Sequence, residues 1–251
     1  MGPPCSPPQQ PILKPAMRGW RGTAEQTGPA RRDRRTNGPA RRDRRTNARL
    51  QSGAMNFDAV ILAGGAARRM DGADKAQVTV GGARLLDRVL DAVRAAGRVI
   101  IVGPERPLAS SWRRSRPPPI WTRERPRGGG PAAALGAGLE AVTAPTVVVL
   151  AVDLPFASSG MVARLLEALT SEVAAEGAIA RDRSGRDQYL AGAYRAGSLR
   201  KRLDALGSAQ GVSMRTVIGG MHLSRLDEDW GGEDCDTWED VRAARQRVGG
   251  D

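Results

Sequence analysis

The sequence predicts an α/β domain with a mainly parallel sheet, because patterns typical of buried strands alternate with amphipathic helical patterns. Apolar runs of strand length, rich in valine and isoleucine, occupy residues 58–63, 98–103, 146–153 and 177–181. Continuous runs of this kind are typical of strands that are buried on both faces. Right-handed crossovers between parallel strands would then bring ligands to the carboxyl ends of the strands.

Amphipathic patterns place helices between these strands and near the end of the chain. Leucine and valine recur at helical spacing over residues 85–93, again over 161–169, and more weakly over 241–248. The segment QYLAGAYR (188–195) is assigned as one further strand. His222, the only histidine, lies in another expected strand away from every motif and is interpreted as structural.

The first 54 residues differ in composition from the rest of the chain. They are rich in proline, glycine, arginine and glutamine, and they contain the segment GPARRDRRTN twice, at 28–37 and 38–47. Such a segment buries too little apolar surface to offset the entropy of ordering. Residues 1–54 are therefore predicted to be a disordered extension and residues 55–251 the folded domain. An alternative is that translation begins at Met55, directly before the first strand.

The positive charge is concentrated in this extension. The chain carries +12 overall, of which residues 1–54, with 12 basic and 3 acidic side chains, contribute +9 and residues 55–251 contribute +3. A nucleic-acid partner would therefore have to bind the arginine-rich extension, and the folded part is not charged like a nucleic-acid-binding domain. That partner stays as an alternative to an extension without a role.

Cysteine content and hydropathy argue against secretion and membrane insertion. Cys5 and Cys235 are too few and too far apart for a disulfide framework or a cysteine zinc site, so a reducing cytoplasm is expected. No apolar run approaches the roughly 20 residues that cross a bilayer, and no apolar stretch has the length of a signal peptide. We expect a cytoplasmic protein with no membrane partner.

A glycine-rich loop directly follows the first strand and predicts a phosphate site. Gly64 and Gly65 allow backbone amides to approach a base or a phosphate, which a β-carbon would obstruct. Arg68, Arg69 and Lys75 follow and supply the positive charge that a triphosphate needs. The loop is not a Walker A motif, because Lys75 is not part of a Gly-Lys-Ser/Thr triplet.

An aspartate stands at the end of the third apolar run. Asp153 follows the strand pattern directly, and Pro155 prevents the strand from continuing. Mg²⁺ accepts one or two protein carboxylates when the substrate supplies phosphate oxygens. Asp153 is therefore the candidate magnesium ligand. Its alternative role as a helix N-cap suits Ser158 and Ser159 better.

The segment LAGGAARRMDGADKA (62–76) resembles the signature of the nucleotidyltransferases, and most closely that of the molybdenum cofactor guanylyltransferases. Five further segments follow in the order of that family: RGGGPAAALGAGL (127–139), VVVLAVDLPF (147–156), RDQYLAGAYR (186–195), GVSMR (211–215) and DCDTWEDV (234–241). The resemblance spans residues 57 to 247. It implies a three-layer α/β/α Rossmann-like nucleotidyltransferase fold with a mainly parallel mixed sheet.

The resemblance also implies a reaction and a set of site residues. The expected reaction transfers GMP from GTP to the terminal phosphate of molybdopterin, or of molybdenum-loaded molybdopterin, and releases pyrophosphate. Molybdoenzymes or cofactor-biosynthesis proteins would receive the product. The expected catalytic residues are Arg69, Lys75 and Asp153, with Mg²⁺ on Asp153. The expected nucleotide and substrate ligands are Leu62, Ala63, Gly64, Gly65, Lys75, Gly103, Glu124, Gly130, Asp153, Arg215, Asp234 and Asp236.

Guanine specificity depends on one residue of the motif. Cytidylyl relatives tend to have LAAG where this chain has LAGG at 62–65. A CTP-dependent molybdopterin cytidylyltransferase or a sugar-phosphate nucleotidyltransferase is therefore the main alternative of the same fold.

This chain departs from the family pattern at several positions. Asp71 stands where the family has glycine, and Arg125 replaces the second of two acids, which leaves Glu124 to contact the nucleotide. The family more often has asparagines where this chain has Asp234 and Asp236. These two acids could add a metal ligand, or Asp236 could cap the following helix with Glu239 as its capping-box partner.

The second glycine run raises a competing interpretation. Gly128, Gly130 and Ala133 fit the dinucleotide pattern G-x-G-x-x-G/A, and Asp153 follows at the distance of a ribose-binding acid. That pattern should follow an apolar strand directly, whereas residues 122–127 are polar. A loop that leads into a helix with Pro131 in its first turn, and that binds phosphate at the helix N-terminus, is the favoured interpretation.

Overall fold

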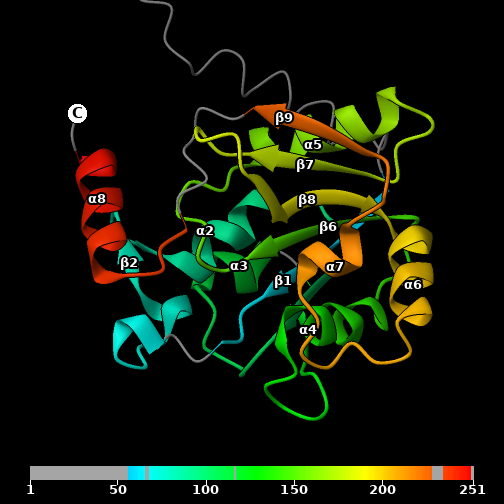
Figure 1. Ribbon diagram of the computed structural model, residues 1–251. Coiled ribbons are helices and arrows are strands. Elements are labelled where there is room, and N and C mark those ends of the chain that lie inside the picture. Colours follow the sequence, from blue (N-terminus) through cyan, green and yellow to red (C-terminus); the bar gives the residue numbers. More distant parts are fainter. Residues whose placement is uncertain (1–55, 66–67, 116, 228–233, 250–251) are drawn as a thin grey trace, which may run out of the picture. The chain divides into compact units, whose positions relative to one another are not determined.

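The computed structural model describes residues 56–65, 68–115, 117–227 and 234–249 (Figure 1). The chain divides into two units, Met1–Gly38 and Pro39–Asp251, and every described residue belongs to the second. The predicted extension, with its tandem repeat and Met55, lies outside the described residues. Among those that are described, no helix is both long and apolar enough to cross a membrane.

A seven-stranded sheet forms the centre of the described unit (Figure 1). In spatial order its strands are β5 (Ile120–Thr122), β4 (Val99–Val102), β1 (Phe57–Leu62), β6 (Thr146–Ala151), β8 (Asp187–Arg195), β7 (Gly177–Arg181) and β9 (Leu223–Asp227). Strand β8 is antiparallel to both of its neighbours, whereas all the other pairs are parallel. Six strands therefore share one direction, and the predicted mainly parallel mixed sheet is confirmed.

The strands form where the apolar runs predicted them. Every residue of β1 and β4 is buried, as a strand covered on both faces requires. Strand β5 was not expected, because its three residues are too few to give a pattern and the segment from Thr122 onward is polar. It extends the sheet at one edge through parallel pairing with β4.

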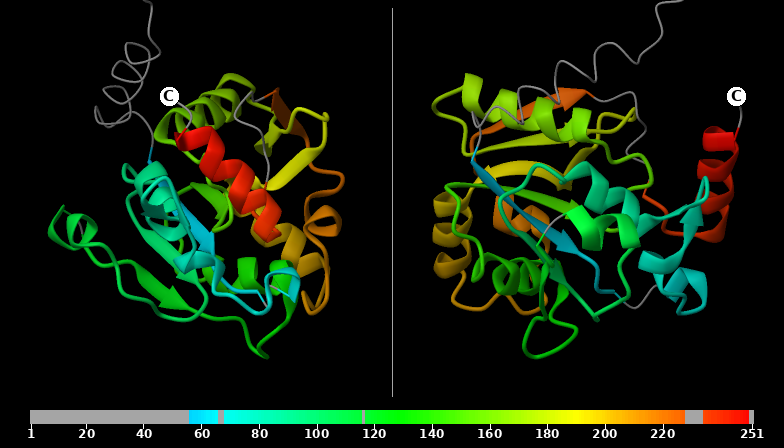
Figure 2. Two further views of the ribbon diagram at one scale, coloured as in Figure 1. Left: turned by 90° about the vertical axis from the view of Figure 1, so that its left-hand side faces the viewer. Right: turned by 180° about the vertical axis from the view of Figure 1, so that it is seen from behind.

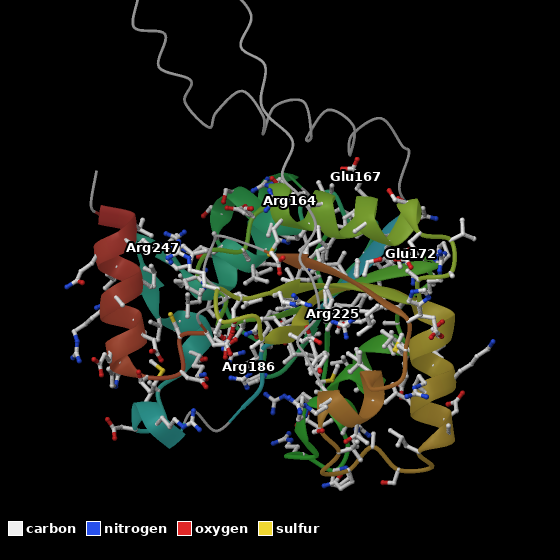
Figure 3. All side chains as sticks on the ribbon, turned by 45° about the horizontal axis from the view of Figure 1, so that its top comes forward. Arg164, Glu167, Glu172, Arg186, Arg225 and Arg247 are labelled. Atoms are coloured by element: carbon white, nitrogen blue, oxygen red, sulfur yellow. The ribbon has the colours of Figure 1, made fainter. Side chains whose placement is uncertain are left out.

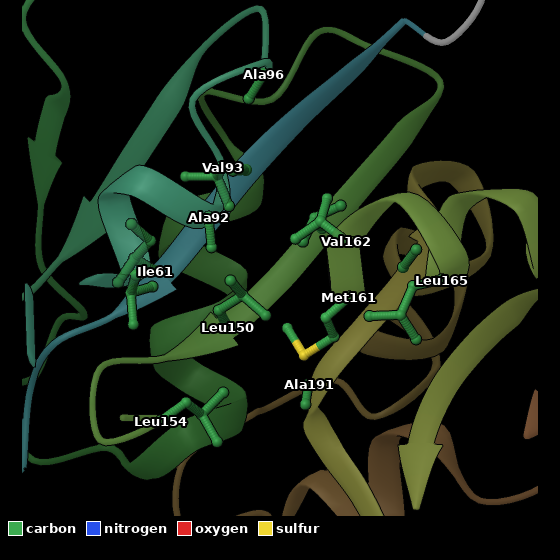
Figure 4. Packing of buried hydrophobic residues seen from close by; sticks show 14 of the residues in the cluster. Ile61, Ala92, Val93, Ala96, Leu150, Leu154, Met161, Val162, Leu165 and Ala191 are labelled. Carbon is green, nitrogen blue, oxygen red and sulfur yellow. The ribbon is translucent and has the colours of Figure 1, made fainter. Parts of the chain in front are cut away.

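Helices cover both faces of the sheet and confirm the three layers. One face is covered by α2 (Leu85–Ala92), α3 (Ser110–Ser115) and α5 (Ser159–Ser171), and the other by α4 (Gly130–Leu139), α6 (Ala196–Ala205) and α7 (Met214–Ile218). Figure 4 shows the first of these cores, where Ile61 and Leu150 of neighbouring strands pack with Met161 and Leu165 of α5. Ser158 caps α5 by accepting a hydrogen bond from the Met161 amide at 3.2 Å, as expected.

A third, smaller core lies beside the carboxyl ends of the strands. It joins α8 (Trp238–Gly249), the two-stranded hairpin of β2 (Thr79–Val80) and β3 (Ala83–Arg84), and the chain around the short 3₁₀ helices η1 (Arg68–Met70) and η2 (Lys75–Gln77) (Figure 2). We call this group of buried residues the third core: Met70, Val78, Val80, Leu85, Cys235, Val241 and Ala244. It packs the segment after β1 against the segment before α8, and both segments carry predicted site residues.

Candidate active site

A cavity of about 740 Å³ opens at the carboxyl ends of β1 and β6. These ends are in register, since Leu62 pairs with Ala151 and the Val152 amide donates to the Leu62 carbonyl at 3.0 Å, so the two following loops adjoin. Ten of the predicted site residues line this cavity: Leu62, Ala63, Gly64, Gly65, Arg69, Lys75, Glu124, Gly130, Asp153 and Asp236. The structure therefore brings together segments that are up to 174 residues apart, from Leu62 to Asp236.

The glycine-rich loop is shaped by close backbone packing. Gly65 has φ +138°, a conformation that residues with a side chain rarely adopt. A β-carbon on Gly103 would lie 2.8 Å from both the carbonyl carbon and the oxygen of Ala63, so Gly103 allows the end of β4 to touch this loop from behind. Gly103 lines a separate cavity of about 1060 Å³, and its predicted contact with nucleotide stays a prediction.

Four charged side chains form an ionic cluster in the main cavity. The Lys75 Nζ atom lies 3.0 Å from Asp153 Oδ2 and also contacts Asp236 Oδ1, while Arg69 Nη1 lies 3.1 Å from Asp236 Oδ2. Lys75 and Asp153 are mostly shielded, with 17% and 19% of their side chains exposed, whereas the Arg69 side chain is 73% exposed. Burial alone would lower the pKa of Lys75, but the charge of Asp153 and hydrogen bonds to Asp236 and Asp153 outweigh it and raise that pKa above its ordinary value. Lys75 is therefore a permanent cation between two carboxylates.

The residue before Lys75 is held by hydrogen bonds on both of its carboxylate oxygens. Asp74 caps η2 by accepting a hydrogen bond from the Ala76 amide at 3.2 Å, and its other carboxylate oxygen accepts one from Arg106 Nε at 2.6 Å. Both Asp74 and Arg106 line the cavity, and neither was singled out from the sequence. Asp74 could have been predicted as a site residue, because it directly precedes Lys75 in the motif. Arg106 could not, because it lies in a loop with no motif. Of the three predicted cations of this loop, Arg68 has a side chain outside the described part of the chain.

The segment before α8 is anchored directly to the strand-end aspartate. The Cys235 amide donates to the Asp153 carbonyl oxygen at 2.9 Å, and the Cys235 side chain is buried in the third core. Burial, followed by the charge of Asp153, raises the pKa of the Cys235 thiol to about 12. Cys235 is therefore a structural anchor between the two acids Asp234 and Asp236.

Of the two alternatives for Asp236, the structure does not support the capping role. Helix α8 is capped by Thr237, whose hydroxyl accepts a hydrogen bond from the Asp240 amide at 3.2 Å, while the Asp240 carboxylate accepts one from the Thr237 amide at 2.7 Å. This reciprocal pair is a capping box shifted by one residue from the predicted Asp236–Glu239 pair. The Asp236 carboxylate is consequently directed to Lys75 and Arg69.

A smaller cavity of about 290 Å³ adjoins the main one and shares Asp153 with it. It contains the remaining predicted residues, Arg215 and Asp234, together with Arg186, which the sequence analysis did not single out (Figure 3). Burial and then the nearby charges of Asp153 and Asp236 raise the pKa of Asp234 to about 6, while Lys75 and Arg186 oppose that shift. Asp153 thus stands between two cavities, each with its own cations.

The second glycine run leads into α4 as predicted, and Pro131 lies in its first turn. Glu124 Oε1 accepts a hydrogen bond from the Gly128 amide at 3.0 Å, so this acid shapes the loop that lines the cavity. Seven residues, 123–129, separate β5 from α4. A dinucleotide fingerprint instead turns directly from a strand into its helix, so this geometry argues against that alternative.

The structure places two further residues of the sequence analysis, and the structural role of His222 stays a prediction. Asp71 adopts φ +52°, the left-handed conformation of the turn where the family has glycine. His222 lies outside all three cavities, and its Nε2 atom is 2.7 Å from Glu172 Oε1.

The acids of the main cavity suit a divalent cation that is shared with a substrate. Within the described residues, no group of three or more His, Cys, Asp or Glu side chains could hold a metal by itself. Asp153 and Asp236, however, converge on one cationic group, the ammonium of Lys75. Two carboxylates with phosphate oxygens from a nucleotide form the ligand set that Mg²⁺ prefers, so the residues present fit it.

A glycine-rich loop, two cations and a carboxylate that follows a strand of an α/β sheet are typical of a site that binds a nucleotide. A family model described as the MobA-like NTP transferase domain matches residues 59–226. The chain belongs to this family and is a nucleotidyltransferase, which confirms the class and the family that the motifs predicted.

Relatives and solved structures agree with this assignment. The chain is 33% identical over 187 residues to a probable molybdenum cofactor guanylyltransferase of Mycobacterium marinum, an alignment that covers 70% of this chain and 86% of the relative. A putative one of Neisseria meningitidis is 37% identical over 110 residues, which cover 42% of this chain and 56% of the relative. The structure of molybdopterin-guanine dinucleotide biosynthesis protein A from Archaeoglobus fulgidus superposes with a TM-score of 0.58 at 18% identity, covering 77% of this chain and all of the other. The structure of 2-C-methyl-D-erythritol 4-phosphate cytidylyltransferase from Thermus thermophilus superposes with a TM-score of 0.57 at 21% sequence identity, covering 78% of this chain and all of the other. At these identities the two structures support the fold alone.

Proposed function

We propose that the protein transfers GMP from GTP to the terminal phosphate of molybdopterin, with or without bound molybdenum, and releases pyrophosphate. The observation that carries the proposal is the ionic cluster of Lys75, Asp153 and Asp236 in the main cavity, of which Asp153 also lines the adjoining smaller cavity. Two adjoining cavities could bind two substrates side by side, as a reaction between the phosphate groups of two molecules requires. The similarity to molybdenum cofactor guanylyltransferases supports the identity of those substrates.

GTP would occupy the main cavity. Gly64 and Gly65 leave the backbone accessible to the base and ribose, and the N-terminus of α4 lines the same cavity. Arg69 and Lys75 would neutralise the triphosphate. A triphosphate with two nearby cations is more open to attack at its α-phosphorus, because its negative charge otherwise repels a phosphate nucleophile.

The acceptor would occupy the smaller cavity. Arg186 and Arg215 line it and supply positive charge for a terminal phosphate on the other side of Asp153. An oxygen of that phosphate would form a bond to the α-phosphorus as the bond to the β-phosphate oxygen breaks, and pyrophosphate would leave. No protein side chain becomes covalent in this displacement, so catalysis depends on positioning and charge.

Mg²⁺ belongs to the same proposal. Asp153, with Asp236 beside it, would hold the ion, and bound Mg²⁺ would neutralise charge on the phosphates during the transfer. A cytoplasmic location, and delivery of the product to molybdoenzymes or other cofactor-biosynthesis proteins, are further parts of this proposal.

Pyrophosphate release by the full chain tests the proposal. With molybdopterin and Mg²⁺ present, GTP should support release, CTP and ATP should support little, and omission of molybdopterin or addition of EDTA should abolish it. Preferential use of CTP would assign the chain to the cytidylyl branch instead. Release with GTP that does not depend on molybdopterin would contradict the acceptor.

A further inference from the structure

Asp236 contacts both cations that we assign to the triphosphate. One of its carboxylate oxygens contacts the Lys75 ammonium, and the other lies 3.1 Å from Arg69 Nη1. A triphosphate that binds these two cations must therefore compete with Asp236 for them. Asp153 competes for Lys75 as well, at 3.0 Å.

The backbone of Asp236 is anchored by hydrogen bonds and by its buried neighbour, whereas the Arg69 side chain is largely exposed. The Asp236 amide donates to Asp240 Oδ2 at 3.0 Å, and the preceding residue, Cys235, is buried in the third core and hydrogen-bonded to the Asp153 carbonyl. Arg69, in contrast, extends a side chain that is 73% exposed. Exchange of partners is therefore expected to move the Arg69 and Lys75 side chains rather than the Asp236 backbone.

Charge balance decides what makes this exchange favourable. A triphosphate alone would pull Lys75 and Arg69 away and leave Asp153 and Asp236 as uncompensated acids next to a polyanion. A divalent cation on these two carboxylates would replace the lost positive charge and release both side chains. Each ligand thus removes an obstacle to the binding of the other, which is positive coupling.

We propose that Asp236 is an ionic latch on Lys75 and Arg69 that makes triphosphate binding depend on a divalent cation. Asp236 is in this sense a positioning residue, because it acts through the two cations. This inference rests on one part of the proposed function, namely that a triphosphate binds in the main cavity. It does not depend on guanine or on the acceptor.

The test compares the full-length wild type with Asp236→Asn, which keeps the shape of the side chain and removes its charge. The probes are inorganic tripolyphosphate, GTP and CTP, each titrated by calorimetry once in EDTA and once with Mg²⁺ in both solutions. In EDTA the variant should bind tripolyphosphate about tenfold more tightly than the wild type, because one repelling and competing charge is gone. Mg²⁺ should improve the affinity of the wild type by about tenfold more than that of the variant.

Glu239→Gln is the matched control. It removes the same charge three residues away, at an exposed position of α8, and should behave like the wild type. Melting curves of all three proteins will show whether the variants are folded, and a merely structural role of Asp236 would alter both affinities without changing their ratio.

Two outcomes would overturn the latch: equal metal-free affinities in wild type and Asp236→Asn, or the same Mg²⁺ enhancement in both. Absence of tripolyphosphate binding to either protein would overturn it too. If tripolyphosphate responds as expected but CTP binds better than GTP, the latch stands and the guanylyl proposal fails.

Discussion

The two ends of the central sheet each carry an important aspartate, and the two are held in different ways. At the start of β1, Asp58 is 2% exposed, and its carboxylate accepts hydrogen bonds from the amides of Arg98 at 2.8 Å, Thr143 at 2.8 Å and Ala144 at 2.9 Å. Just past β6, Asp153 has its side chain 19% exposed and contacts the ammonium of Lys75.

This difference separates an acid that stabilises the fold from an acid that serves the site. The backbone amides around Asp58 cannot be withdrawn without unfolding the loops that bear them. The ammonium group on Asp153 ends a flexible side chain that faces a cavity, so a ligand can replace it. A carboxylate is therefore available for chemistry when its partners are mobile side chains.

The largest expected effect is on catalysis, from Asp153→Asn. The amide keeps the shape but loses the charge that would hold Mg²⁺, so guanylyl transfer should fall by about a thousandfold or more. Stability should change by less than about 1 kcal/mol, because Lys75 keeps its contact with Asp236. Steady-state kinetics and urea denaturation measure the two quantities. Near-normal turnover would remove Asp153 from the catalytic centre.

Asp58→Asn should reverse this pattern. The amide has one acceptor oxygen and an NH₂ group, so at least one of the surrounding buried N–H groups would lose its partner and face another donor. We expect a loss of about 3 kcal/mol in the free energy of unfolding, with kcat per folded molecule unchanged. Urea denaturation measures the loss of stability. Steady-state kinetics, at a temperature where the variant remains folded, measures kcat. A fall in kcat comparable to that of Asp153→Asn would contradict the separation of the two ends.

Much of this arrangement could be predicted from local sequence. Apolar runs located the strands and helical spacing located the main helices, because both report burial of consecutive residues. The glycine loop and Asp153 were found for a related reason: parallel topology places the segment after each strand at the same edge. The resemblance added the substrates and the more distant residues of the site.

The pairing of Asp236 could not be found in this way. Both Asp236–Glu239 and Thr237–Asp240 have capping-box spacing, and only the geometry of α8 shows that the second pair forms. The contact between Lys75 and Asp236 joins residues 161 positions apart, and it depends on the packing of the third core. Arg186 begins a segment that resembles the family, but it was not assigned to the site, because it lies in a loop between β7 and β8 with no periodic pattern.

A medium effect is expected for the cations of the smaller cavity. Arg186→Gln and Arg215→Gln should each raise the KM for molybdopterin about tenfold, with a smaller change in the KM for GTP, because each removes one charge that faces the acceptor phosphate. Lys201→Gln, at an exposed position of α6, is the control for lost charge. Arg225 is a less suitable control, because its Nε atom lies 3.2 Å from Asp187, which lines the same cavity (Figure 3). Equal increases in both KM values would argue against separate donor and acceptor cavities.

The smallest effect extends the comparison to Asp234, whose side chain has neither backbone nor ammonium partners among the described residues. Burial and the charges of Asp153 and Asp236 raise its pKa to about 6 in the folded protein, above the ordinary value of 3.8. The folded state therefore favours the protonated form, and wild-type stability is lost as the pH rises from about 4 through 6. Asp234→Asn avoids this loss.

In EDTA, the unfolding free energy of Asp234→Asn should exceed that of the wild type by an amount that grows from pH 4.5 to pH 7.5 and then stays constant. This gain should reach about 1 kcal/mol, because Asp234 is partly exposed. Urea denaturation across this range measures the gain. A gain that shrinks as the pH rises would mean that ionised Asp234 is stabilised in the fold, as Asp58 is by its amides, and not strained by its acidic neighbours.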